Sequence, residues 1–582
     1  MLLLYKRKKR TARRPFSRKK EPARSGTANG QHPEELRRRL LGLVFVFLLL
    51  FGLCEARLAH LALDADAAAA VRRQSSWEQQ LTQGRGIIYD HDLEPLTDTI
   101  RQAAAVVTAG SSGYNDLFRL ALPQDRTLLY SGVGGSRPFV VRLNALPETE
   151  TAAVTFTYPM RYNVLPLAQH IIGYCSGDGR GVAGMERAFD DWLQGGADVL
   201  WAECSTTALA QAAGDVRLVQ KQGSGNALQL TLDRVIQRIC EDVAAEMLSS
   251  GAIVVLECRT GRIKASVSMP QYDPYDVQKS IEAQDTALIN RAFSSYNVGS
   301  VYKPLLAALA LENGLDAAEK YECSGSIEVD GHTYRCARRT GHGSIDLAGA
   351  LQQSCNCYFI RMGQQLGAQC IVEFSSLCGL GQATQLGGGY QAGKGNLPDV
   401  AVLSSSGELA GLSFGQGKLT ATPLQLAAAF NVFANDGVYI APSLAEGLVN
   451  SYTGDVVQSL YRPVQLQVLE KETADTMLSM LESGVAEGLG AAAAIPEAAV
   501  GGKTGTAQTG RSRTLANGAQ QELYDSWFVG FYPAQQPQYT IAVMADSTTV
   551  TGEDVAPVFA AVCRQLYYLQ PQDLANSTNL GT

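Results

Sequence analysis

The chain has 582 residues, of which 46% are hydrophobic and 18% are charged, which is the composition of a globular protein of several domains and not of a disordered one. Its formal net charge of −7 is unevenly spread, because residues 1–39 hold fourteen Lys or Arg against three Glu, a net of +11, which leaves −18 for the remainder. A basic segment followed by an acidic bulk is typical of a membrane boundary and argues against nucleic acid as a partner.

An apolar stretch follows the basic segment directly. The fourteen residues from Leu40 to Leu53 are all apolar or Gly, which is short of the about twenty that a span needs. A signal peptide is the alternative, but the basic region here is about twice as long as such a peptide has. A lipoprotein anchor at Cys54 fits poorly, because bulky Leu53 precedes it where a small residue is expected.

We therefore predict one transmembrane anchor within residues 40–60. The excess of positive charge before it predicts that residues 1–39 form a cytoplasmic tail and that the rest of the chain lies outside the cell. We expect this tail to be disordered and to lie against anionic membrane lipid.

Residues 61–225 show no acid–base or metal-ligating constellation. Gly84 to Asp90 predicts a strand behind Arg85. The segment is too short for a glycosyltransferase domain with its own paired carboxylates. We interpret it as a structural spacer and a surface on which partners dock.

From residue 226 the pattern predicts a helix followed by a hairpin. Asp233 caps a helix whose apolar residues repeat every 3.6 positions, residues 251–256 form a buried strand, and residues 262–268 return beside it. After Ser300 we expect a largely helical stretch to about residue 440. Strands are expected again around Lys503 and over residues 527–544, and an amphipathic helix over residues 553–569.

The centre of the chain holds Ser300 and Lys303, which lie one turn apart on a helix. The residues after them, 305–312, are apolar helix formers that Asn313-Gly314 would end, and Pro304 is tolerated in a first turn. A serine is a poor nucleophile alone, but a lysine that burial or a second cation keeps neutral can take its proton. An isolated pair of this spacing arises often by chance in ordinary core helices.

Two further motifs give this pair meaning. Ser354-Cys355-Asn356 is an S-x-N triplet at the start of an expected helix, and Lys503-Thr504-Gly505-Thr506 is a K-T-G-T run. S-x-x-K, S-x-N and K-T-G in this order are the signature of the penicillin-recognising serine enzymes. The chain therefore resembles a class B penicillin-binding protein, a monofunctional peptidoglycan D,D-transpeptidase, over roughly residues 85–565.

The resemblance implies an α+β fold. A transpeptidase domain similar to serine β-lactamases, with an antiparallel sheet covered by helices, would occupy residues 226–570. Residues 61–225 would be the non-catalytic N-terminal pedestal, and residues 571–582 a C-terminal tail. The implied enzyme is anchored in the cell membrane by one span, cross-links peptidoglycan stem peptides through a serine acyl-enzyme, and is acylated and inhibited by β-lactams.

The resemblance also implies roles for the catalytic residues. Ser300 is the nucleophile that attacks the penultimate D-alanine carbonyl, and Lys303 is its base. Ser354 would relay the proton to the leaving group, and Asn356 would hold the substrate amide. Lys503 would help to keep Lys303 neutral.

The substrate-binding residues follow from the same motifs. Lys503 and the Thr504 hydroxyl would bind the terminal carboxylate of the substrate, and Gly505 would leave room for substrate along the strand. The backbone amides of Ser300 and Thr506 would form the oxyanion hole. No cofactor or metal is expected.

The implied partners are D-Ala-D-Ala stem peptides, β-lactams, membrane lipid and a membrane glycosyltransferase of the shape or division type. A serine β-lactamase, a penicillin-sensing receptor and a catalytically inactive scaffold remain as alternatives. The sequence does not separate elongation, division and sporulation roles, and it does not identify the acceptor amine, the partner or the sensitivity to β-lactams. Asp273 and Asp276 could be mistaken for an acid pair, but we expect them to face solvent.

Twelve cysteines occur, eleven of them after the predicted span, with no spacing that suits zinc. Cys323 and Cys336 bracket an expected hairpin with Asp330-Gly331 at its turn, so we predict that they lie close enough to form a disulfide, although their redox state stays open. Cys355 and Cys357 are expected to pack as small hydrophobic side chains.

Overall fold

The computed structural model describes residues 33–63, 76–108, 113–132, 137–148, 151, 153–163, 166–205, 216–283 and 285–569. The predicted C-terminal tail lies outside these residues, as does the basic tail up to residue 32. The chain divides into two compact units, residues 1–76 and 77–582.

The first unit contains one long helix, α1 (Pro33–Leu63). Within it, the 24 residues Arg37–His60 are long and apolar enough to cross a membrane, by length and composition. The helix extends well beyond the fourteen-residue apolar stretch that the sequence singles out, so its length is no obstacle to a span. The prediction of one N-terminal apolar anchor helix is thus confirmed as far as length and composition go.

The second unit is built around a five-stranded antiparallel sheet with the order β10-β9-β25-β24-β23. Its strands are β9 (Gly251–Glu257), β10 (Ile263–Met269), β23 (Gly501–Thr514), β24 (Gln520–Tyr532) and β25 (Tyr539–Thr548). β9 and β10 are the hairpin that the sequence predicts. β23 carries the K-T-G run and lies at one edge of the sheet.

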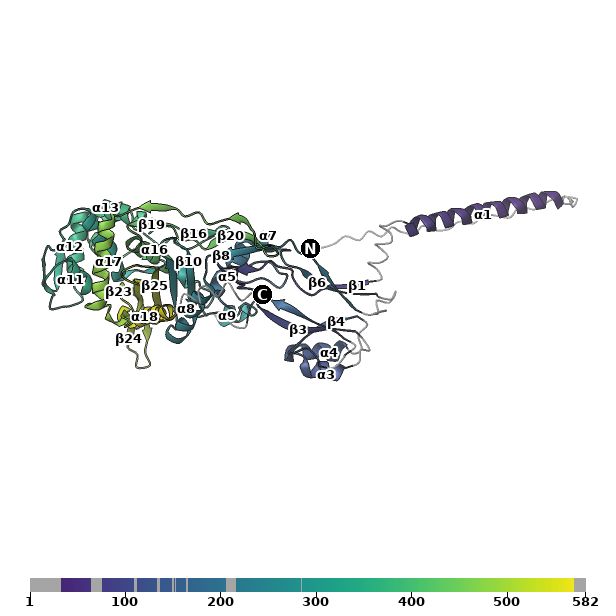
Figure 1. The fold of residues 1–582 in the computed structure, drawn as a ribbon, viewed down its shortest axis with the longest axis horizontal. Helices are drawn as coiled ribbons and strands as arrows, with labels where there is room; N and C mark the ends of the chain where they lie inside the picture. The colour runs from purple at the N-terminus through teal and green to yellow at the C-terminus, as the bar shows by residue number, and fades with distance from the viewer. Residues whose placement is uncertain are drawn as a thin grey trace, which may run out of the picture. The chain divides into compact units, whose positions relative to one another are not determined.

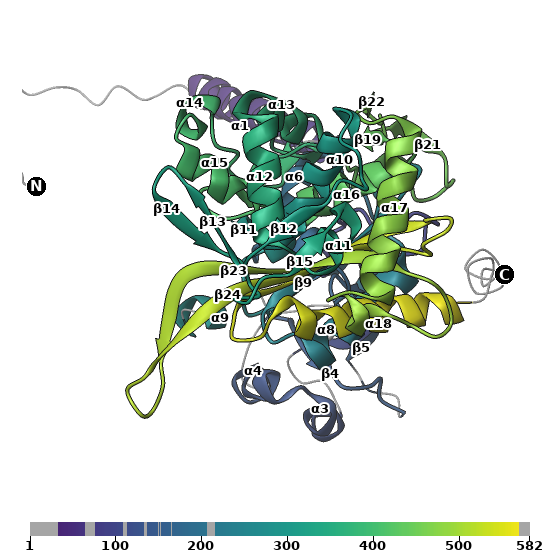
Figure 2. The same ribbon diagram turned by 90° about the vertical axis from the view of Figure 1, so that its left-hand side faces the viewer.

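Helices cover both faces of this sheet, and the strands are apolar on both sides for that reason. Ile253, Val255 and Val543 belong to one core cluster, whereas their neighbours Val254 and Ala542 belong to the other, as the two-residue period of a strand requires. The first face is covered by α8 (Arg234–Met247) and α18 (Gly552–Tyr568), which lie below the sheet in Figure 2. The α+β fold with helices on an antiparallel sheet is confirmed.

The opposite face carries the helices at which the S-x-x-K and S-x-N motifs lie. Most of the helices on this face lie above the sheet in Figure 2, and α16 packs on its central strands. These helices are α10 (Lys303–Glu312), α11 (Leu347–Gln352), α12 (Asn356–Leu366), α13 (Ala368–Leu377), α16 (Pro423–Ala434) and α17 (Lys471–Ala486).

The stretch after Ser300 is less helical than expected. Between α10 and α11 the chain forms two small antiparallel ladders, β12 (Tyr321–Cys323) with β15 (Gly343–Ile345) and β13 (Ser326–Val329) with β14 (His332–Arg335). Asp330 and Gly331 form the β13–β14 turn with φ of 47° and 76°, as a two-residue hairpin turn requires. The predicted hairpin is confirmed, but the expectation of continuous helix is wrong here.

The β23–β24 hairpin extends beyond the rest of the sheet, as Figure 2 shows. From Gln508 to Gln520 most of its side chains are exposed, whereas Gly501 to Gly505 are buried between α17, α18 and the turn before α10. The K-T-G run therefore lies in the buried half of the strand.

The N-terminal part of the second unit consists of smaller sheets (Figure 1). The order β4-β3-β5 joins Phe139–Leu143, Ile100–Val107 and Val154–Met160, with α3 (Tyr114–Leu120) and α4 (Arg126–Gly132) packed against it. A second sheet contains β1 (Ser76–Gln80), β6 (Val199–Ser205) and β7 (Arg217–Lys221). The predicted strand behind Arg85 is present but short, β2 (Ile88–Tyr89).

A third sheet joins this part to the residues that follow. β2 pairs in parallel with β8 (Asn226–Leu230), which also pairs with β20 (Ala445–Asn450). β21 (Val456–Ser459) completes this sheet. Because its strands come from both sides of residue 225, the predicted domain boundary there stays a prediction.

A buried ion cluster fixes the base of the N-terminal part. Glu186 is fully buried and accepts hydrogen bonds from Arg85 and Arg161, and Arg161 also pairs with Asp98. Burial alone would raise the pKa of the Glu186 carboxyl, but the two guanidinium groups hold it below its ordinary value. Every charge in this cluster therefore has an opposite charge beside it, which is the arrangement that buried ions need.

Candidate active site

Ser300 lies in a turn that leads directly into a buried helix. Residues Gly299–Tyr302 form a 3₁₀ turn, and α10 begins at Lys303 without a break, with Pro304 in its first turn and Asn313 at its end. Lys303 and the seven residues after it are buried. The predicted helix is therefore confirmed, with Ser300 one turn before Lys303 and itself partly exposed.

Two glycines allow the Ser300 turn to approach its neighbours. Gly299 has φ of +64°, and a Cβ placed on it would lie 3.1 Å from the Thr506 carbonyl oxygen on β23. Gly415 has φ of +80°, accepts a hydrogen bond from the Gly299 amide at 2.8 Å, and would place a Cβ only 1.8 Å from the Gly299 carbonyl oxygen. The nucleophile turn is thus held between β23 and the segment around Gly415.

Lys303 connects the first motif to the second. Its Nζ donates to the Ser354 carbonyl oxygen at 2.8 Å, to the Ser354 Oγ at 3.0 Å and to the Asn356 Oδ1 at 2.7 Å. The amine also lies 5.7 Å from the centre of the Phe359 ring on α12. The amine therefore lies within hydrogen-bond distance of three acceptors of the S-x-N triplet.

The S-x-N triplet forms the tight connection between α11 and α12. Ser354 has φ of 50°, the left-handed conformation that usually ends a helix with glycine. Cys355 is the N-cap of α12 and Asn356 is its first residue. Strained backbone of this kind concentrates at functional sites, because surrounding contacts must hold it in place. Here they turn Ser354 and Asn356 toward the same lysine.

The K-T-G run on β23 packs against the Ser300 turn. A Cβ on Gly505 would lie 2.9 Å from the Val301 side chain and 3.2 Å from the Val301 amide nitrogen. In this structure the glycine therefore allows the turn itself to approach the strand. The Thr506 Oγ1 accepts from the Gly552 amide at 2.9 Å, which joins the strand to the start of α18.

Lys503 is the second buried amine. Its Nζ donates to the Thr504 carbonyl oxygen at 3.1 Å and to the Thr504 Oγ1 at 3.4 Å. Burial and the charge of Lys303 lower the pKa of Lys503 to about 7, and burial lowers the pKa of Lys303 to about 8. Among the described residues, neither lysine forms an ion pair. The site therefore holds amines that lose their protons near neutral pH.

The three motifs thus meet in one place. The structure joins Lys303 to Ser354 and Asn356 by hydrogen bonds, and it joins the Ser300 turn to β23 by packing. Asp273 and Asp276 are exposed on a loop, as expected. The reasoning from sequence missed Gly415 as a support of the Ser300 turn, although its Gly-Gln-Gly context was visible.

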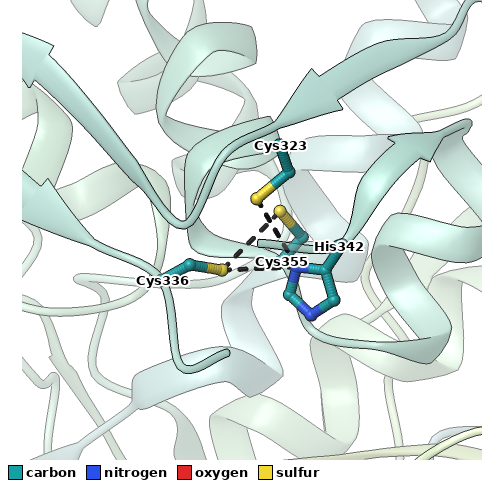
Figure 3. Close-up of side chains that lie close together, drawn as sticks. All are labelled: Cys323, Cys336, His342 and Cys355. Atoms are coloured by element: carbon teal, nitrogen blue, oxygen red, sulfur yellow. Dashed lines mark hydrogen bonds between the residues drawn. The ribbon is translucent and has the colours of Figure 1, made fainter. Parts of the chain in front are cut away.

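Cysteine and histidine side chains gather beside the S-x-N triplet. Cys323, Cys336, His342 and Cys355 place their ligand atoms within 4.8 Å of one another (Figure 3). Spacing along the chain did not indicate this group, and the expectation that the chain binds no metal stays a prediction. The Cys323 and Cys336 sulfurs are close, as predicted, but both are free thiols in the structure.

The comparisons with known proteins identify the family. Residues 251–564 match the family model described as penicillin binding protein transpeptidase domain. The chain belongs to this family. The prediction of a class B penicillin-binding protein is confirmed, and the matched segment contains all three motifs.

Relatives and solved structures agree with this assignment. The chain is 30% identical to stage V sporulation protein D of Bacillus subtilis over 413 residues, which are 68% of this chain and 62% of that protein. It is 28% identical to the penicillin-binding protein PbpB of Mycolicibacterium smegmatis over 525 residues, 85% of this chain and 78% of that one. Its fold is similar to penicillin-binding protein 3 of Mycobacterium tuberculosis in complex with aztreonam, with 25% identity, a TM-score of 0.60 and coverage of 86% of this chain and 98% of that one.

Proposed function

We propose that the chain is a membrane-anchored D,D-transpeptidase that cross-links peptidoglycan stem peptides through an acyl-enzyme on Ser300. The observation that carries this proposal is the buried Lys303 amine, which lies one turn after Ser300, has its pKa lowered to about 8 and contacts both polar residues of the S-x-N triplet. A neutral amine in this position is a suitable base for a serine hydroxyl.

In the proposed acylation, Lys303 accepts the proton of the Ser300 hydroxyl as the oxygen attacks the penultimate D-alanine carbonyl. Ser354 lies 3.0 Å from the same amine and relays the proton to the nitrogen of the departing D-alanine. The Asn356 side chain binds the backbone amide of the donor stem peptide. An amine from a neighbouring peptidoglycan strand then attacks the acyl carbonyl and releases Ser300.

The edge position of β23 supports the proposed substrate orientation. β23 pairs with β24 on one side only, and its other side is packed by the Ser300 turn near Thr506. We propose that the backbone amides of Ser300 and Thr506 form the oxyanion hole, where each donor is worth roughly a hundred- to a thousandfold in rate. Lys503 and Thr504 bind the terminal carboxylate, whose negative charge would favour the protonated form of Lys503.

The proposal extends to location and partners. α1 anchors the chain in the cell membrane, with residues 1–39 in the cytoplasm, and residues 61–225 form the non-catalytic pedestal of the transpeptidase domain of residues 226–570. The relevant partners are membrane lipid, D-Ala-D-Ala stem peptides, β-lactams and a membrane glycosyltransferase. The aztreonam complex of the mycobacterial protein supports the β-lactam part of this proposal.

Labelling of membranes with a fluorescent penicillin tests the proposal. We expect the full-length protein to form a covalent band that resists denaturation and that disappears in Ser300→Ala. Ser294→Ala is the matched control, because Ser294 lies six residues earlier and its hydroxyl donates to the Asn290 carbonyl oxygen. A wild-type protein that folds but takes up no label would support an inactive scaffold instead.

A further inference from the structure

Three distances within the Cys323, Cys336, His342 and Cys355 cluster are those of a tetrahedral metal site, and all of its ligand atoms lie within 4.8 Å of one another. The His342 Nδ1 lies 3.6 Å from the Cys323 Sγ and 3.5 Å from the Cys336 Sγ, and the Cys336 and Cys355 sulfurs are 3.8 Å apart (Figure 3). Zinc bonds of about 2.3 Å to sulfur and about 2.0 Å to nitrogen at tetrahedral angles separate two sulfurs by about 3.8 Å, and sulfur from nitrogen by about 3.6 Å. The three observed distances match these values.

We propose that these four side chains bind one Zn²⁺ ion, with three thiolate sulfurs and the His342 Nδ1 as ligands. Among the described residues, this is the one group of three or more His, Cys, Asp or Glu side chains that gathers so closely. Three thiolates and an imidazole are a ligand set that soft and borderline metals such as zinc prefer. On binding, the three thiol protons leave to solvent and no oxidation state changes.

The fold brings the four ligands together from separate short segments. Cys323 ends β12, His342 directly precedes β15, and the two strands pair. Cys336 follows β14, and its amide donates to the Gly325 carbonyl oxygen at 2.9 Å. Gly341 packs against the backbone of residues 323–325 so closely that a Cβ on it would lie 2.2 Å from the Cys323 carbonyl oxygen. The ligand-bearing turns are therefore packed against each other independently of any metal.

A disulfide explains the arrangement less well. It would bring two sulfurs to about 2.0 Å and leave the third sulfur and the imidazole without a common partner. His342 instead lies at nearly equal distances from two different sulfurs, and the third sulfur is close to one of these. Four ligands around one metal ion must lie at similar short distances from one another, as these atoms do. Without a metal, ionised thiolates at these buried positions would be costly.

The position of Cys355 connects this site to the S-x-N triplet. Cys355 separates Ser354 from Asn356, and both of these contact Lys303. The Asn356 Nδ2 also donates to the Arg335 carbonyl oxygen at 3.3 Å, next to Cys336. A bound ion would therefore tie the strained α11–α12 connection to the hairpin ladders. This consequence for acylation rests on the proposed function, whereas metal binding itself does not.

Metal analysis of the full-length protein, purified in detergent without chelator, tests the site. We expect one zinc per chain by elemental mass spectrometry. After chelation under reducing conditions, titration with Co²⁺ should give the thiolate-to-cobalt charge-transfer absorption and visible bands of a tetrahedral site. Ser300→Ala should bind the same amount of metal, because Ser300 is not a ligand.

Two ligand variants and two controls sharpen this test. Cys323→Ser and His342→Ala should lose the zinc and the cobalt spectrum. Cys378→Ala removes another buried thiol from the same core and should keep both. His342→Cys supplies a fourth thiolate, so it should retain one metal with a stronger charge-transfer band, which distinguishes loss of a ligand from loss of the fold.

The results separate this inference from the proposed function. Wild-type protein without zinc, with no cobalt spectrum after reduction or with two of these cysteines joined in a disulfide, would overturn the metal site even if penicillin labels Ser300. Zinc retained in both Cys323→Ser and His342→Ala would overturn it as well. Protein that binds zinc but takes up no penicillin would overturn the proposed function alone. If both stand, metal depletion should slow acylation on the order of 100-fold, the effect of a displacement of about 1 Å.

Discussion

Buried cationic side chains occur in two regions of the second unit, and only one of these regions pairs them with carboxylates. Around Glu186, the guanidinium groups of Arg85 and Arg161 are paired with carboxylates, and this pairing keeps the guanidinium groups charged although burial opposes their charge. Around Ser300, Lys303 and Lys503 are equally buried, but among the described residues they have no carboxylate partner in an ion pair. Burial therefore lowers their pKa values to about 8 and about 7.

The difference distinguishes a structural cluster from a reactive one. A paired buried charge stabilises a fold only while both partners remain, and its protonation state is fixed. An unpaired buried amine costs free energy of folding, but it can change protonation near neutral pH, as a general base must. The Glu186 cluster should therefore control stability without affecting chemistry, and the Lys303 site should do the reverse.

Lys303→Met should have the largest effect on chemistry. It keeps the buried volume but removes the base, so acylation by a fluorescent penicillin should fall by at least the hundred- to ten-thousandfold that general-base catalysis contributes. The rate constant is measured by quenched labelling of full-length protein. Lys418→Met, which removes an exposed lysine from a surface ion pair, is the control. Labelling of Lys303→Met at the wild-type rate would contradict the assigned role.

Glu186→Ala should have the largest effect on stability. It leaves Arg85 and Arg161 buried without their shared partner, which costs about 3–5 kcal/mol of unfolding free energy. The expected result is a lower thermal midpoint with an unchanged acylation rate per folded molecule. If the acylation rate of the folded fraction falls as in Lys303→Met, the separation of the two regions is wrong.

Ser354→Ala should be milder than Lys303→Met. The hydroxyl acts as a relay that water can partly replace, so we expect a loss near the lower end of the general-acid range, about a hundredfold. Ser375→Ala is the matched control, because Ser375 is also a buried serine near α10 but contacts the Tyr302 hydroxyl at 2.7 Å. Equal rates for the two alanine variants would remove Ser354 from the mechanism.

The smallest effect is a change in pH dependence. Because Lys303 must be neutral to accept a proton, the acylation rate should rise with pH and level off above about 8, the pKa to which burial lowers it. The groups that face it are Lys503 and the thiols of Cys336, Cys355 and Cys357, which would raise the pKa of Lys303 if ionised. Lys503, with a pKa of about 7, has already lost most of its proton where Lys303 titrates, so Lys503→Met should leave the inflection near 8. A rate that falls with rising pH over this range would contradict a lysine base.

The sequence predicted what is encoded locally. The S-x-x-K, S-x-N and K-T-G motifs, α8, the β9–β10 hairpin and α18 each depend on short-range patterns, and the structure places them as expected. The functions of single glycines could not be predicted, because the contact of Gly505 with Val301 joins residues about 200 positions apart.

Clusters assembled from distant residues were missed for the same reason. Arg85 and Glu186 were visible separately, yet only the packing of several short elements joins them. His342 gave no signal, because its distances along the chain to the three cysteines match no familiar metal-binding spacing. Such sites depend on tertiary structure and not on periodicity.

The fate of a β-lactam adduct tests the central claim most directly, because transpeptidases and β-lactamases share all three motifs. Full-length protein should be pulsed briefly with penicillin, freed of the drug and followed by intact-mass spectrometry, with peptide mapping of the modified residue. A transpeptidase that excludes water should retain the added mass on Ser300 for many minutes. Rapid return to the unmodified mass, with turnover of penicillin in solution, would contradict the account and identify a hydrolase.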